Sequence, residues 1–259
     1  MSETFTVRHG DVAVAVHGEG AGPAVVLLPS LGRGAEDFDA VAPRIAAAGF
    51  RVLRPEPRGI GGSTPLRGHE TLHDLAADIA AVIETLGAAP AIVAGHAAGN
   101  WVARMVAHDR PDLVRGVAMV AALLGTGSDP AIRPSIAGSF DPALADAERL
   151  AHLRRAYFAP GHDASVWLQG WHPAVARAQR RAADATTDTA WLRAADRAPL
   201  LYLAAAQDAI APVPTPQALR DALGPRAVLA VIEDAGHALL PEQPAATAAA
   251  LIAWARELA

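Results

Sequence analysis

The sequence predicts an α/β fold in which a mostly parallel central sheet carries helices on both faces. Short, wholly apolar runs are typical of strands that are buried on both faces, and the chain contains several of them. Helix-like segments alternate with these runs, which indicates crossover connections between parallel strands. The 259 residues, of which 52% are hydrophobic, suffice for one sizeable core.

The first part of the chain already shows this alternation. Residues 4–7 and 12–17 show the alternating side-chain pattern of strands with two different faces. This pattern predicts that the sheet begins with antiparallel strands. Residues 24–28 form a continuous apolar run and therefore predict a buried strand. A helix is expected over residues 35–48, where a glycine follows as a stop signal. Residues 50–55 are then expected to form the next strand.

A second helix is predicted over residues 71–86, because its apolar side chains fall on one face. These side chains are Leu72, Leu75, Ile79, Val82, Ile83 and Leu86. Thr71 and Asp74 match a capping box at the start of this helix. The remaining strands are expected at residues 91–94, 117–120, 200–204 and 227–232, and the last helix at residues 243–258.

The stretch from residue 125 to residue 195 breaks the alternation, because it holds polar helix-like segments and no good strand. We therefore predict a helical cap over residues 125–195. The cap would be inserted into an α/β core that consists of residues 1–124 and 196–259. Neither repeats nor low-complexity linkers divide the chain further.

Composition excludes several classes of function. The net charge of −5 contains no block of like charge, so we expect neither nucleic acid nor a membrane as a partner. Cysteine and lysine are absent, which excludes thiolate nucleophiles, Schiff-base lysines and P-loop nucleotide binding. With no signal-peptide pattern and no long apolar stretch, we expect a cytoplasmic protein that acts on a small molecule. Whether it forms a homodimer stays open.

The most informative stretch is Gly95-His96-Ala97-Ala98-Gly99, which lies between a strand-like and a helix-like run. This is the setting of the G-x-S-x-G nucleophile elbow. The central position holds Ala97 where the motif has serine, and a methyl group cannot attack a carbonyl. Further along the chain, Asp208 and His237 each follow a late strand, in the order acid and then histidine.

On these motifs the chain resembles the α/β-hydrolase superfamily over nearly its whole length. The resemblance implies that Asp208 orients His237, which acts as general base and then as general acid. It also implies an oxyanion hole made by the backbone N–H groups of Leu31 and Ala98, although Pro29-Ser30-Leu31-Gly32 departs from the family's His-Gly motif. Neither a metal nor a cofactor is implied. Taken singly, Asp208 and His237 could instead cap a turn and a loop.

Four further residues are candidates to bind the substrate. Ser30 carries a hydroxyl near the expected pocket, although it could equally bond to local backbone. Trp167, Trp171 and His172 could form an aromatic roof, which suits an apolar or aromatic substrate. The alternative is that both tryptophans belong to the core of the cap.

Two patterns resemble other active sites without fitting them. His69-Glu70-Thr71-Leu72-His73 matches the H-E-x-x-H pattern of zinc proteases. The helix is expected to begin only after the first of these histidines, so the two rings would not converge on a metal ion. Ser63, in a glycine-rich turn that also contains Arg58, is a candidate for a displaced nucleophile, but we expect this turn to be structural.

Three hypotheses account for Ala97. It could be a Ser→Ala substitution that traps the substrate of a serine hydrolase. It could be the native residue of an enzyme in which His237 activates water or a carbon acid while the oxyanion hole stabilises the developing charge. The third hypothesis is a binding protein without catalytic turnover. The Pro29-Ser30 departure at the oxyanion loop indicates an already diverged chain, and it favours a native alanine.

Overall fold

The computed structural model describes residues 3–124 and 128–258, and the expected start of the cap at residue 125 lies outside them. Within these residues, one sheet has the strand order β1-β2-β4-β3-β5-β6-β7-β8. The strands are β1 (Glu3–His9), β2 (Val12–Gly20), β3 (Ala24–Leu28), β4 (Arg51–Pro55), β5 (Ala91–His96), β6 (Val114–Val120), β7 (Leu200–Ala205) and β8 (Ala227–Ile232).

The sheet is antiparallel only at its beginning. The β1–β2 and β2–β4 pairs are antiparallel, and every pair from β4 through β3, β5, β6 and β7 to β8 is parallel. The predicted fold class, a mostly parallel sheet flanked by helices, is therefore confirmed. The antiparallel start that the alternating pattern indicated is present as well.

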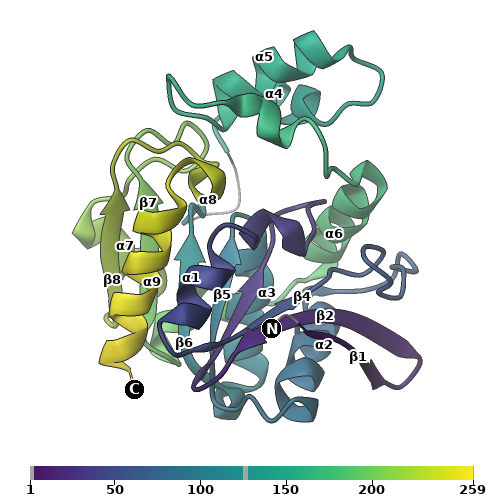
Figure 1. Cartoon of the computed structure of the whole chain (residues 1–259), viewed down its shortest axis with the longest axis vertical. Helices are drawn as coiled ribbons and strands as arrows, with labels where there is room; N and C mark the ends of the chain where they lie inside the picture. The colour runs from purple at the N-terminus through teal and green to yellow at the C-terminus, as the bar shows by residue number, and fades with distance from the viewer. Residues whose placement is uncertain (1–2, 125–127, 259) are drawn as a thin grey trace.

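Helices cover both faces of the sheet (Figure 1). They are α1 (Ala42–Ala47), α2 (Leu72–Thr85), α3 (Gly99–Asp109), α7 (Pro216–Leu223), α8 (Leu239–Glu242) and α9 (Pro244–Glu257). Successive strand residues point to opposite faces, so Val26 of β3 belongs to one buried cluster and its neighbours Val25 and Leu27 belong to another. The first cluster includes residues of α2 and α3, and the second includes residues of α1 and α9. This double burial explains why the parallel strands are continuous apolar runs.

The predicted helix over residues 35–48 is divided in the structure. A short 3₁₀ helix, η1 (Ala35–Phe38), precedes α1, and Val41 is the N-cap residue of α1. Pro43 stands at the second position of α1, where its missing N–H would have no partner in a new helix but would break a continuous one. The predicted helix at residues 71–86 is observed, with Thr71 and Asp74 forming the capping box.

The described part of the segment between β6 and β7 contains helices and no strand. These are α4 (Arg133–Ser139), α5 (Asp146–Ala156), η3 (Ala164–Trp167), α6 (Pro173–Ala185) and η4 (Ala190–Asp196). Figure 1 shows α4 and α5 as a layer above the sheet. By contrast, η4 packs against α3 of the core, where Arg104 Nη1 donates to Leu192 O. The division into core and cap at residues 124–125 and 195–196 stays a prediction.

Every helix within the described residues is too short or too polar to span a lipid bilayer.

Candidate active site

The turn between β5 and α3 is sharply bent at Ala97. Its φ of +44° lies in the left-handed region, which residues other than glycine rarely adopt. The flanking glycines permit so tight a turn, because a Cβ on Gly95 would overlap the backbone of Gly99, and one on Gly99 would overlap the backbone around β3. Asn100 Nδ2 donates to Ala97 O and thereby braces the turn. A strained strand-to-helix turn is the geometry of a nucleophile elbow.

Asp208 and His237 form a buried hydrogen-bonded pair at the ends of β7 and β8. Asp208 Oδ2 lies 2.9 Å from His237 Nδ1, and the two side chains are 0% and 5% exposed. Asp208 Oδ1 accepts from the N–H groups of Ile210 and Ala211, both at 2.8 Å. A carboxylate accepts hydrogen bonds, so it favours the neutral tautomer of His237 that carries its proton on Nδ1 and its lone pair on Nε2. The pair is therefore arranged so that Nε2 can act as a base.

A second histidine, His96, lies directly behind His237. The rings are 5.3 Å apart, and His96 Nε2 donates to the His237 carbonyl at 2.9 Å. Burial, and then the proximity of His237, lower the pKa of His96 to about 3. His96 is thus a neutral hydrogen-bond donor at ordinary pH, and it holds the backbone of the His237 loop in place.

Two backbone N–H groups at this end of the sheet have no hydrogen-bond acceptor among the described residues. In the described parts of the chain, no acceptor takes a hydrogen bond from the N–H of Leu31 or of Ala98. Ala98 stands immediately before α3, where the helix dipole adds a partial positive charge. Unpaired N–H groups at a helix start are suited to stabilise an oxyanion.

Leu31 and Ala98 line a cavity of about 730 Å³ that residues of α4 and α6 also line. Of the predicted site residues, Ser30, Leu31, Ala97, Ala98, Trp171 and His237 line it. Ala121, at the end of β6, lines it too and has a second positive φ, +45°. Backbone strain of this kind gathers at functional sites. A cavity of this size is within the range of small-molecule sites.

The structure places Trp167 and His172 elsewhere. Trp167 is 3% exposed, belongs to an apolar cluster that also includes Ile210 and Ala238, and is not among the described residues that line the cavity. His172 meets the core by its backbone, since its N–H donates to Gly32 O at 2.8 Å. A Cβ on Gly32 would overlap Ala176 of α6, so only glycine permits this close approach of the core loop to the cap.

Sequence reasoning missed Arg33, which connects the loop after β3 to the segment between β6 and β7. The guanidinium lies 4.9 Å from the ring centre of Trp167 and 4.8 Å from that of Trp171. Its Nη1 donates to Gln169 O at 2.6 Å, and its ion-pair partner is the buried Asp37. The spacing of Arg33 and Asp37 by four residues was the one available signal. Nothing in the sequence indicated that two tryptophans far along the chain enclose this arginine.

Tyr157 and Glu242 were missed as well. Tyr157 lines the cavity with its ring 5.6 Å from that of His237, and burial raises its pKa to about 12, so its hydroxyl stays protonated. Burial also raises the pKa of Glu242, whose carboxylate accepts from the N–H groups of Gly236 and Ala159 at 2.8 and 2.6 Å. Glu242 thereby ties the His237 loop to the cap.

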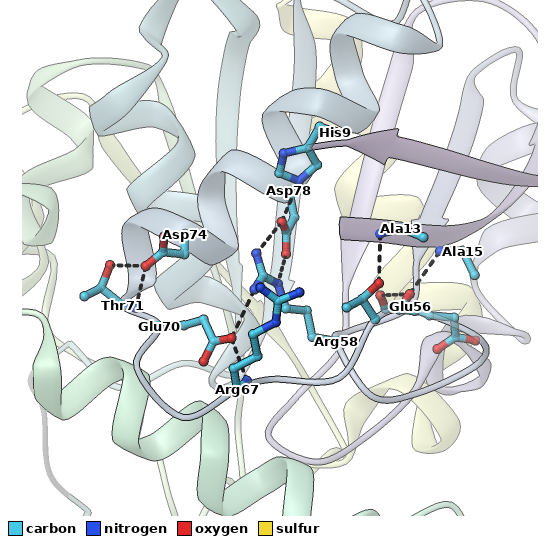
Figure 2. A network of polar contacts seen from close by, with 12 residues as sticks. His9, Ala13, Ala15, Glu56, Arg58, Arg67, Glu70, Thr71, Asp74 and Asp78 are labelled. Atoms are coloured by element: carbon cyan, nitrogen blue, oxygen red, sulfur yellow. Dashed lines mark hydrogen bonds and ion pairs between the residues drawn. The ribbon is translucent and has the colours of Figure 1, made fainter. Parts of the chain in front are cut away.

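The residues of the two patterns that resemble other active sites form structural contacts instead. Arg58 pairs with Asp78 and Glu70, and Asp78 in turn accepts from His9 (Figure 2). The Ser63 hydroxyl donates to Glu56 O and accepts from Ala15 N, which engages it fully in the core.

In the H-E-x-x-H segment, α2 begins at Leu72, so His69 lies outside the helix. His73 instead pairs with Asp109 at 2.8 Å. Within the described residues, no three His, Asp or Glu side chains are grouped as a metal site would need. The two histidines of this pattern therefore do not converge.

The order of the strands, the strained turn after β5 and the Asp–His pair after β7 and β8 define the class of α/β-hydrolase folds. The model of the Alpha/beta hydrolase family matches residues 25–250. The chain belongs to this family.

Among curated proteins, the chain is similar to Epoxide hydrolase A of Mycobacterium tuberculosis, with 35% identity over 111 residues, which are 41% of this chain and 33% of that protein. It is also similar to BpoC, described as a candidate non-heme bromoperoxidase of the same organism, with 32% identity over 42% of each chain. The matches thus span well under half of the length of these relatives.

Solved structures extend the similarity over the whole fold. The crystal structure of BpoC from Mycobacterium tuberculosis has a TM-score of 0.80 and 25% identity, and the alignment covers 97% of this chain and 100% of that one. A thermophilic esterase from Thermogutta terrifontis has a TM-score of 0.75 and 22% identity, with 100% and 99% covered. At 22% identity, the similarity to the esterase shows only that the two proteins share a fold.

Proposed function

We propose that this protein is an α/β-hydrolase-fold enzyme that acts on a small, partly apolar carbonyl compound, such as an ester, a lactone or a β-dicarbonyl. In this proposal Ala97 occupies the nucleophile position, and His237 with Asp208 supplies general-base catalysis. The observation that carries it is the Asp208–His237 pair, whose histidine lines the same cavity as the strained Ala97 turn. The similarity to Epoxide hydrolase A supports a small electrophilic molecule as substrate.

The chemistry would proceed without a covalent intermediate. His237 Nε2 takes a proton from a bound water as the water oxygen attacks the carbonyl carbon. The carbonyl oxygen becomes negative and accepts from the N–H groups of Leu31 and Ala98. When the carbonyl reforms, the bond to the leaving group breaks, and the leaving atom takes the proton from His237; this atom is the alkoxy oxygen of an ester or lactone and the α-carbon of a β-dicarbonyl. Asp208 holds the imidazole in the required tautomer throughout.

The first test is turnover of a panel of aryl esters, lactones and β-diketones by the unchanged chain and by His237→Ala. Turnover of at least one compound is expected, and the substitution should lower it about 10²–10⁴-fold, the usual contribution of general acid–base catalysis. His69→Ala serves as the control, because this histidine lies outside the cavity. Saturable binding in the cavity with no turnover of any compound would contradict the proposal and favour a non-catalytic binding protein.

The second test restores the missing hydroxyl with Ala97→Ser and follows a nitrophenyl ester before the steady state. A stoichiometric burst of nitrophenol is expected, because serine at this turn would be acylated. Ala98→Ser is the matched control, since it places a hydroxyl one residue further along the same cavity wall. If neither variant gives a burst, Ala97 does not stand where a nucleophile can be activated.

A further inference from the structure

The wall of the cavity is markedly basic, although the chain as a whole is acidic. Four arginines line it, namely Arg133, Arg177, Arg180 and Arg181, and no aspartate or glutamate is among the described lining residues. The net charge of the whole chain is −5. A cleft lined by one sign of charge concentrates ligands of the other sign. The cavity therefore favours anions that the rest of the molecule would repel.

Three of these arginines lie on one face of α6. Arg177 and Arg181 are one helical turn apart, and Arg180 lies between them on the side of Trp101. The Arg180 guanidinium lies 5.2 Å from the ring centre of Trp101, which also lines the cavity. This stacking holds the charged group of Arg180 against the cavity wall.

None of the four arginines forms an ion pair with a carboxylate in the described residues. Like charges three and four positions apart destabilise a helix. For the arginines of α6, no ion pair within the described residues offsets this repulsion. The buried Arg33 and the half-buried Arg58 have carboxylate partners, whereas the four cavity arginines are exposed to solvent. A bound anion would supply the missing partner, and a guanidinium fork matches a carboxylate well.

We propose that the cavity takes substrates that carry a carboxylate, and that Arg177, Arg180 and Arg181 of α6 bind this carboxylate while the carbonyl group lies near His237. The inference rests on the proposed function, since it names the chemical class of molecule for that same cavity. The apolar walls, which include Phe140 and Trp171, would enclose the part of the molecule between the two groups.

The test compares the binding of phenylacetate and phenylacetamide by calorimetry, because the two probes share a shape and differ in charge. In the unchanged chain at low salt, phenylacetate should bind about tenfold more tightly, since charge-assisted hydrogen bonds are about twice as strong as neutral ones. High salt should reduce this preference, because the arginines are exposed to solvent.

The informative variant is Arg177→Gln/Arg181→Gln, in which the preference should fall to about twofold or less. Its matched control is Arg154→Gln/Arg155→Gln, which removes two exposed charges from α5 outside the cavity lining and should leave the preference unchanged. Thermal unfolding of both variants verifies that they fold. Equal binding of the two probes by the unchanged chain overturns the proposal, and so does an equal loss of preference in both double variants.

This outcome is independent of the proposed function. A charge preference without turnover of any carbonyl compound would leave the anion site standing and contradict catalysis. Turnover of neutral esters without a charge preference would support catalysis and contradict the anion site.

Discussion

Replacement of Arg33 by methionine tests how the loop after β3 holds the helical segment between β6 and β7. Arg33 and its partner Asp37 are 3% and 1% exposed, and the substitution leaves the Asp37 carboxylate buried without its cation. Breaking a buried ion pair from one side costs about 3–5 kcal/mol. The two lost contacts with Trp167 and Trp171 each contribute about 0.5–2 kcal/mol, but they share one guanidinium and are not additive. We expect a total loss of about 4–5 kcal/mol, dominated by the uncompensated carboxylate.

The assay is denaturant unfolding, followed by tryptophan fluorescence. Arg33→Met/Asp37→Leu should recover much of the loss, because it removes the buried carboxylate together with the cation. The control is Arg110→Met, whose ion pairs lie at the surface and which should move the midpoint little. If the double variant is no more stable than Arg33→Met, the buried charge is not the source of the loss.

The same variant should show a distinctive pH dependence. Burial raises the pKa of Asp37 above its ordinary value of 3.8, and the Arg33 guanidinium opposes this. Without Arg33 the folded-state pKa rises further, so the folded protein retains a proton that the unfolded chain releases above pH 3.8. The stability of Arg33→Met should therefore fall, relative to the unchanged chain, as the pH rises above this value. An equal loss at every pH would refute the reasoning.

Two further predictions concern the histidines. In Asp208→Asn, the side-chain amide can donate to His237 Nδ1, so the proton should move to Nε2; nitrogen NMR of the imidazole would detect the change, and an unaltered tautomer would contradict it. Turnover should fall about 10⁴-fold, as it does when the acid of a serine-protease triad is neutralised. Between pH 6.5 and about 3, His96 is neutral in the folded protein and protonated in the unfolded chain. The free energy of unfolding should therefore fall as the pH falls through this window. His96→Gln should flatten this decline in unfolding midpoints measured between pH 7 and pH 4, relative to the unchanged chain.

Local sequence was sufficient for the features that depend on neighbouring residues. Gly95 and Gly99 permit a tight strand-to-helix turn at Ala97 because close backbone contacts leave no room for a Cβ at either position. Thr71 and Asp74, three residues apart, form a capping box, and the start of α2 was therefore predictable. The continuous apolar runs indicated parallel strands because such strands are buried on both faces.

The sequence by itself thus determined the fold class, the turn at Ala97 and the order of Asp208 and His237. Only the tertiary structure decided which distant groups meet. It brought Asp208 within 2.9 Å of His237, enclosed Arg33 between Trp167 and Trp171, and placed the arginines of α6 along the cavity. The physical reason is that these contacts join segments whose separation along the chain carries no periodic signal. They form when the strands take their order in the sheet and the cap packs onto the loops at its end.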